Sequence, residues 1–270
     1  MQCSKKILNV WGEYLKSPES ARVLDTGPNG WFSDVGKQDL TTVANVDETS
    51  YSFEEMFVCD PSAKYHGFTS WDHFFTRVFR EGIRPVAFPH RHEVIANARE
   101  SSPYNVAYNV RARDKFWIKG QLYSVLDMLA HDELAQQFVG GTIYQAFLSA
   151  LSYHRWHSPV AGEIVKAYVR EGTYYSEPLF TGLADPHGPD IAGEGTGQGY
   201  ISAVATRAII FIEADNPDIG LMCIMPVGMV EVSTCDITVK EGQHVEKGEQ
   251  LGMVSFYNHQ ILEKTCINTA

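Results

Sequence analysis

The sequence predicts an α+β fold, with helices in the first part of the chain followed by a mainly antiparallel β body. Two patterns predict this class. Before residue 142, apolar residues recur with the 3.6-residue period of an amphipathic helix, and after it short apolar or alternating runs are separated by turn residues. With 270 residues, 44% of them hydrophobic, the chain can bury the core of one large domain or two small ones.

The first predicted helix lies before Pro18, which limits it because proline cannot continue a helix. Its apolar residues share one helical face, so we expect the helix to dock by a single stripe. These residues are Ile7, Leu8, Trp11, Tyr14 and Leu15.

A second helix should begin near Thr69 or Ser70, with Asp72 in its first turn, and end at Gly82 and Pro85. The residues that it should bury are Phe74, Phe75, Val78 and Phe79.

The third predicted helix has Ser124 as its N-cap, with Asp127 three residues later, and closes at Gly140 and Gly141. Its apolar stripe consists of Leu126, Leu129, Leu134 and Phe138.

Four segments of the second half have the composition of strands bounded by turns. They are residues 143–148, 163–169, 208–213 and 221–225. Residues 215–220, with Asn216, Pro217 and Gly220, predict a turn between the last two strands. Residues 182–199 are dense in Gly, Asp and Pro but lack a Walker lysine and the Rossmann glycine spacing, so we expect a mobile loop there rather than a phosphate site.

Composition and charge exclude several classes of protein. The formal charge of −11 and the lack of a basic run disfavour a nucleic-acid partner, because such binding depends on clustered Lys and Arg. No apolar stretch approaches the length of about 20 residues that spans a bilayer, and Met1 to Lys6 is not followed by an apolar secretion signal. We therefore expect a cytoplasmic protein without a transmembrane segment. The sequence leaves a homo-oligomer open.

The cysteines and remaining histidines do not predict a metal site. Five cysteines without CxxC spacing indicate free thiols rather than a disulfide framework or a zinc knuckle. His90 and His92 lie in a loop-like stretch, and no HExxH pattern accompanies them. We expect no metal.

The most informative motif is Tyr153-His154-Arg155-Trp156-His157-Ser158-Pro159. Imidazole exchanges protons near neutral pH, so two nearby histidines suggest acid–base chemistry. On a helical turn, His154 and His157 would lie on one face and address one volume, whereas on a strand they would point apart. The alternative interpretation is a pair of packing or solvated histidines beside the aromatic Trp156.

Three motifs in this order make the chain resemble the phosphatidylserine decarboxylase family, over residues 57–256. They are Phe68–Arg77, Tyr153–Gly162 and Gly242–Gly252. Further segments resemble the fungal branch that includes L-tryptophan decarboxylases: residues 116–119, 140–151 and 211–217.

The resemblance implies a self-cleaving proenzyme in which a serine becomes a pyruvoyl group, the electron sink for removal of an α-carboxylate as carbon dioxide. By motif position, His157 corresponds to the family's self-processing base and His154 to the group that protonates the decarboxylated intermediate; the two roles remain interchangeable. Glu100 aligns with the family's triad acid, which would orient an imidazole. The implied ligand is an amino acid or an aminophospholipid, and the sequence favours the amino acid.

The chain departs from the family at the processing site. After Phe256 the family continues Gly-Gly-Ser-Thr, but this chain has Tyr257, Asn258, His259 and Gln260, and no serine follows. Ser255 is a poor substitute because Val254, unlike glycine, does not permit a strained turn before it. We expect that the chain neither forms the pyruvoyl group nor decarboxylates.

This departure also sets the expected organisation of the chain. We predict an N-terminal helical segment over residues 1–56, a phosphatidylserine-decarboxylase-like catalytic domain over 57–256 and a divergent tail over 257–270. We further expect a truncated or misspliced product of low stability.

Two other interpretations remain. The chain could be a non-catalytic protein that binds a small molecule in the retained pocket. It could also be a carrier module, because two segments resemble sequences found in lipoyl and biotinyl domains: Ser158–Ile164 and Val239–Gly252. The carrier interpretation lacks a recognisable acceptor lysine at a hairpin tip.

Overall fold

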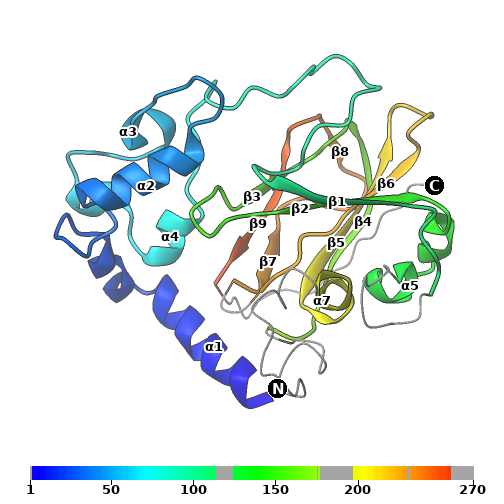
Figure 1. Cartoon of the computed structure of the whole chain (residues 1–270), viewed down its shortest axis with the longest axis horizontal. Helices are drawn as coiled ribbons and strands as arrows, with labels where there is room; N and C mark the ends of the chain where they lie inside the picture. Colours follow the sequence, from blue (N-terminus) through cyan, green and yellow to red (C-terminus); the bar gives the residue numbers. More distant parts are fainter. Residues whose placement is uncertain (1, 114–123, 175, 177–196, 230–231, 257–270) are drawn as a thin grey trace.

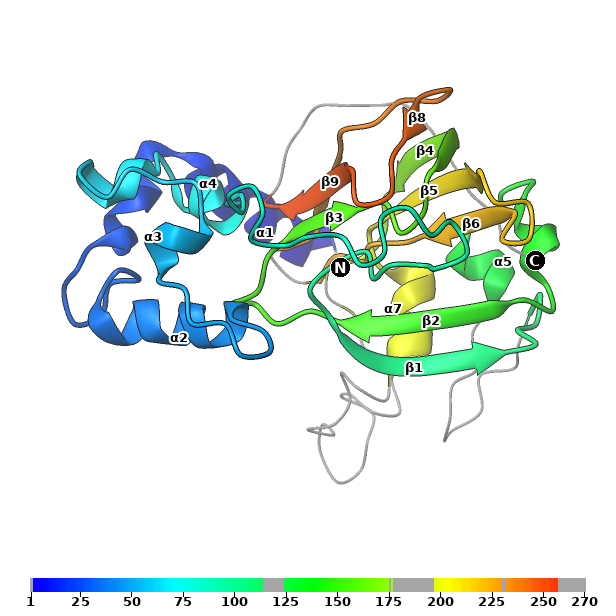
Figure 2. The same ribbon diagram turned by 90° about the horizontal axis from the view of Figure 1, so that it is seen from above.

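A computed structural model describes residues 2–113, 124–174, 176, 197–229 and 232–256, and the structural statements below refer to these ranges. The α+β class is confirmed. Helices between residues 18 and 75 gather at one side of the molecule and antiparallel sheets form the other, and the N-terminal helix runs from the helical side along the β part (Figures 1 and 2). No helix in the described part is long and apolar enough to cross a membrane.

The helical part contains α-helices and short 3-10 turns packed around aromatic side chains. They are α1 (Gln2–Lys16), η1 (Pro18–Leu24), α2 (Asp34–Ala44), α3 (Phe53–Met56), η2 (Lys64–Gly67) and α4 (Trp71–Phe75). Phe32 meets Phe74 edge to face, with an interplanar angle of 87°, and Phe53 lies 5.3 Å from Phe32 between ring centroids. Such edge-to-face geometry is favourable for aromatic rings, so these buried rings form a compact core.

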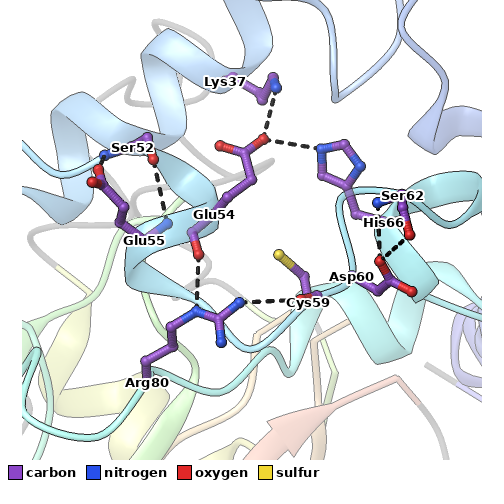
Figure 3. Close-up of polar contacts among 9 residues, drawn as sticks. All are labelled: Lys37, Ser52, Glu54, Glu55, Cys59, Asp60, Ser62, His66 and Arg80. Carbon is purple, nitrogen blue, oxygen red and sulfur yellow. Dashed lines mark hydrogen bonds and ion pairs between the residues drawn. The ribbon is translucent and has the colours of Figure 1, made fainter.

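Glu54 on α3 contacts three segments of the helical part and its neighbourhood (Figure 3). Its carboxylate accepts from Lys37 Nζ on α2 at 2.8 Å and lies 3.1 Å from His66 Nε2, while its carbonyl accepts from Arg80 Nε at 2.9 Å. Burial raises the pKa of Glu54, but the hydrogen bond from Lys37 and the carboxylate's other contacts outweigh it and the pKa falls. One carboxylate therefore links segments that are distant in the chain.

The β part has three antiparallel sheets. A ribbon pairs β1 (Ser102–Tyr108) with β2 (Thr142–Phe147). A second sheet has the order β3 (Arg155–His157), β9 (Gln250–Ser255) and β7 (Thr234–Ile237), and a third has the order β6 (Leu221–Ile224), β5 (Arg207–Ala214), β4 (Gly162–Arg170) and β8 (His244–Val245). The remaining elements are α5 (Val125–Met128), η3 (Ala135–Phe138) and α7 (Gln198–Val204).

Strand β5 lies at the centre of the main core. Its residues Ile209 to Ile212 are completely buried, and they belong to one core with side chains from both larger sheets, such as Trp156 on β3 and Ile164 on β4. A strand buried on both faces reads as a continuous apolar run, which is the pattern of Ala208 to Ile212.

The expectation that the first helix docks by a single stripe is wrong for the N-terminal part of that stripe. Helix α1 forms as predicted, but Ile7 and Trp11 are exposed, and Leu15 near its end is the residue that enters a core, with Phe75 and Phe256. The periodic pattern located the helix but did not show which of its apolar residues are buried.

The second helix begins as predicted, with Ser70 accepting a hydrogen bond from the backbone N–H of His73, but ends at Phe75 rather than near Gly82. The chain beyond it is extended and pairs with the segment after α3, since Val58 N–H donates to the carbonyl of Val78 at 2.8 Å. Val78 is consequently exposed rather than buried.

The third predicted helix is also interrupted. It forms α5 and η3, separated by Ala130 and His131 in the left-handed region, with φ of 54° and 57°. Ser124 does not cap the backbone; its hydroxyl donates to Asp127 Oδ2 at 2.6 Å instead. A side-chain partner has therefore replaced the expected cap.

The predicted strands are confirmed as β2, β4, β5 and β6, and the turn after β5 closes with Gly220 at φ 64°. Gly242 and Gly248 have φ of 75° and 87°, as expected for tight turns in the last third. Of the expected loop, residues 182–196 lie outside the described residues, whereas Gln198 and Gly199 begin α7. The predicted tail, residues 257–270, also lies outside them.

Candidate functional site

The motif around His154 and His157 lies where β3 meets the last described strand, β9 (Figure 1). Arg155 pairs with Met253 and Trp156 with Gly252, and Val254 N–H donates to the carbonyl of His154 at 3.0 Å. Two of the motifs that carry the family resemblance, Tyr153–Gly162 and Gly242–Gly252, are therefore neighbours in space.

Close packing fixes this strand pair. The Trp156 side chain is fully buried, and a Cβ added at Gly252 would lie 2.7 Å from Trp156 Cζ3 and 2.3 Å from the carbonyl oxygen of Asp236. Only glycine fits there, because real side chains do not approach so closely.

His157 is held by two hydrogen-bonding partners. Its Nδ1 lies 2.8 Å from the carbonyl oxygen of Gly248, and its Nε2 lies 3.2 Å from the hydroxyl of Tyr153. A carbonyl oxygen only accepts, so Nδ1 carries the proton and Nε2 accepts from the phenol. Burial lowers the pKa of His157, which keeps the ring neutral at neutral pH.

His154 has a more apolar environment. Its ring stacks on Phe75 of α4, with centroids 3.8 Å apart, and its Nε2 lies 3.2 Å from the carbonyl oxygen of Ala150. Burial, followed by the positive charge of Arg99, lowers the pKa of His154 to about 3. This imidazole is a poor base and, once protonated, a strong acid.

The interpretation that places both histidines on one face of a helical turn is wrong. Arg155 to His157 form a strand, because Gln250 to Met253 of β9 provide hydrogen-bonding partners. Residues three apart alternate sides on a strand, and the two rings have separate partners: Phe75 for His154, and Tyr153 with Gly248 for His157.

Glu100 pairs with Arg84, whereas its alignment with the triad acid predicts that it orients an imidazole. Its carboxylate accepts a hydrogen bond from Arg84 Nε, and no described hydrogen bond joins it to either histidine. Burial raises the pKa of Glu100 against the opposing effect of Arg84. In this arrangement the acid is engaged in an ion pair between two positions of the segment that connects α4 to β1.

The end of β9 carries acidic contacts that sequence reasoning missed. The buried Ser255 hydroxyl donates to Asp236 Oδ2 of β7 at 2.5 Å, and Phe256 N–H donates to Asp72 Oδ1 of α4 at 3.0 Å. Burial raises the pKa of Asp72. The sequence placed Asp72 only in a helical first turn, and no local signal indicates a partner 184 residues away.

Two further kinds of site bear on the described part of the chain, a metal site and a carrier lysine. No group of three or more His, Cys, Asp or Glu side chains could hold a metal ion there. Lys247, next to the Gly248 turn, is buried and donates to the carbonyl of Phe88 at 2.9 Å, so it does not provide the exposed lysine that a carrier module needs.

The α+β fold, with paired histidine and β9 motifs meeting in one sheet, has the organisation expected of the decarboxylase family named above. The comparison with family models agrees: one described as phosphatidylserine decarboxylase matches residues 71–259, and a second of the same description matches residues 2–40. The chain belongs to the phosphatidylserine decarboxylase family.

Individual relatives include fungal decarboxylases. Decarboxylase iboD of Amanita muscaria is 47% identical over 259 residues, covering 93% of this chain and 73% of the relative. L-tryptophan decarboxylase of Psilocybe cyanescens is 42% identical and covers 93% of this chain, which spans 59% of that protein. Phosphatidylserine decarboxylase proenzyme 3 of Schizosaccharomyces pombe is 30% identical, over 70% of this chain and 18% of the relative.

Proposed function

We propose that this chain is the body of a pyruvoyl-dependent decarboxylase of amino acids that does not convert a serine of its own into the pyruvoyl group. The observation that carries the proposal is the site itself: a neutral His157, with its tautomer fixed, lies beside the strand that leads to the family's processing position.

The geometry at Ser255 does not fit formation of that group. Ser255 and Val254 lie in regular antiparallel pairing with Thr234 and Cys235, and the Ser255 hydroxyl is committed to Asp236. Attack of a serine hydroxyl on the preceding carbonyl needs a distorted backbone, which regular strand pairing opposes. The sequence after Phe256 has no serine either.

The environments of the two histidines support different roles. The Nε2 atom of His157 is an acceptor and suits a base. His154 is proposed as the proton donor from its motif position; its pKa of about 3 leaves it neutral at neutral pH, so it would have to take up a proton before giving one to a carbanion. Glu100 is proposed from its motif position, and to orient an imidazole it would have to leave Arg84.

An amino-acid substrate is supported by the relatives. Proteins named L-tryptophan decarboxylase match 93% of this chain at 40–42% identity, whereas the phosphatidylserine decarboxylase of Schizosaccharomyces pombe matches a smaller share at 30%.

A repaired variant tests the proposal. We expect the purified chain to keep the intact mass of 30.2 kDa. The variant Tyr257→Gly/Asn258→Gly/His259→Ser/Gln260→Thr should split into two fragments, one with a ketone terminus that reacts with hydroxylamine. The matched control carries His259→Ala in place of His259→Ser and should stay intact. Cleavage of the unmodified chain would refute the proposal, and so would a repaired chain that releases carbon dioxide from phosphatidylserine but from no amino acid.

A non-catalytic amino-acid-binding protein is the second candidate, favoured by the same misfit at Ser255. It predicts that the repaired chain stays intact while tryptophan still raises the melting temperature of the unmodified chain. A mass addition at a lysine would instead support the carrier module.

A further inference from the structure

Arg99 has buried hydrogen-bond donors without acceptors. Its Nε and Nη2 atoms are shielded from solvent and have no hydrogen-bonding partner. The residue directly follows Ala98, whose carbonyl accepts from His157 N–H at 2.9 Å. An unsatisfied guanidinium is costly to bury, so its presence beside the histidine motif needs an explanation.

Two other arginines of the described chain, the buried Arg207 and the half-buried Arg155, show what a structural arginine looks like here. Arg207 donates from Nε, Nη1 and Nη2 to the carbonyls of Met128, Ala205 and Asp127, each at 2.7 Å. Arg155 donates to the carbonyl of Thr76 at 2.8 Å and to Gln250 Oε1 at 2.9 Å. Arg77 also has a buried Nε without a partner, but its Nη2 donates to the carbonyls of Leu151 and Ser152. Arg99 makes no described bond of this kind, so its role differs from that of a structural support.

The charge and position of Arg99 point to an anion. Burial lowers the pKa of Arg99 to about 10, so the guanidinium stays charged at neutral pH, and the group that opposes this shift is the Cys235 thiol rather than a carboxylate. The same charge acts on His154 and helps to lower its pKa. Nε and Nη2 form the planar fork that binds two oxygens of one carboxylate.

We propose that Arg99 is the anion-binding residue of this site and that its Nε and Nη2 take the two oxygens of a carboxylate on an amino-acid ligand held near His154. This inference rests on the proposed amino-acid ligand. Because both nitrogens are shielded, the ligand must displace the side chains that cover them.

The carboxylate has two sources, the α-carboxylate or an acidic side chain. A guanidinium bound to an α-carboxylate stabilises it as an anion and opposes its loss as carbon dioxide. A side-chain carboxylate is not consumed, so Arg99 would favour a dicarboxylic amino acid in a catalytic chain and an α-carboxylate in a binding protein.

Titration calorimetry with matched ligands tests this binding on the intact chain. L-Glutamate against L-glutamine isolates the side-chain carboxylate, and L-tryptophan against tryptamine isolates the α-carboxylate. We expect the acid of at least one pair to bind about tenfold tighter or more, the scale of a charge-assisted bidentate contact. Arg99→Met should remove that preference, Arg99→Lys should weaken it, and the exposed-site control Arg91→Met should keep it. Equal binding within both pairs, or a preference that survives in Arg99→Met, contradicts the proposal.

Urea unfolding separates ligand binding from a structural role. Arg99→Met should be at least as stable as the parent chain, because it removes an unpartnered buried charge, whereas Arg207→Met should unfold at a lower urea concentration. If both variants are destabilised alike, Arg99 is structural. Neither measurement depends on self-cleavage, so a chain found to process itself would overturn the proposed function and leave this inference standing.

Discussion

Single buried side chains set the chemistry of this site. His154 and His157 are both neutral at neutral pH because burial opposes their protonation, while Arg99 stays charged near them. The positive charge of Arg99 next to a neutral, weakly basic imidazole favours anionic ligands and disfavours a second cation. The residue types were visible in the sequence, but their protonation states depend on the surroundings.

Acid should destabilise the fold through His154. Its pKa is about 3 in the folded chain and near 6.5 when unfolded, so the unfolded state binds more protons between these values and stability falls as the pH drops below 6.5. At pH 5 the loss from His154 is about 2 kcal/mol. His157, whose pKa is also lowered, adds to the loss, whereas the raised pKa values of Asp72 and Glu100 oppose it.

Urea unfolding at pH 7.5 and pH 5 measures this effect. The variant His154→Gln should lose about 2 kcal/mol less stability between the two pH values than the parent chain. The exposed histidine variant His131→Gln is the control and should behave like the parent. An equal pH dependence in His154→Gln and the parent would show that His154 is not buried in its neutral form.

At the scale of elements, the β3–β9 pair depends on the absence of a side chain at Gly252. The variant Gly252→Ala should destabilise the protein by about 1–3 kcal/mol, since the new methyl group would collide with Trp156 and with the Asp236 carbonyl. Gly82→Ala is the matched control: it meets no atom within 4 Å, and its φ of 82° should cost about 1 kcal/mol. Thermal unfolding that ranks the control as the less stable variant would argue against this packing.

Elements with strong local patterns were predictable, and elements made by distant partners were not. Strands β4 and β5 follow from their apolar composition and the turn residues around them. Strand β3 does not, because three residues before Ser158 and Pro159 suit a turn or a strand, and only β9 decides between them. The site has the same limit: the sequence identified His157, but its partner Gly248 is 91 residues away.

The whole molecule is joined across its helical and β parts by buried contacts. Arg77 lies over the rings of Phe57 and Phe74 and donates from Nη2 to the carbonyl of Leu151 at 2.6 Å, just before β3. Tyr153, which contacts His157, also belongs to the aromatic core of the helical part. Helical packing therefore reaches the candidate site directly.

This continuity bears on the boundary predicted at residues 56 and 57, which stays a prediction. Phe32 and Phe53 lie before it and pack with Phe68 and Phe74 after it, so a cut there divides one aromatic core. We expect a chain lacking residues 1–56 to be insoluble or unfolded, because Phe68 and Phe74 would be exposed to water.

The matched control lacks residues 2–11 only, which removes the exposed Ile7 and Trp11 but keeps Leu15. It should stay folded, with far-UV circular dichroism and tryptophan fluorescence changing together in a single urea transition. A soluble, cooperatively folded fragment 57–270 would instead show that the β body is stable alone. The helical part would then be an added domain, and the contact from Arg77 to Leu151 would be a contact between domains rather than part of one core.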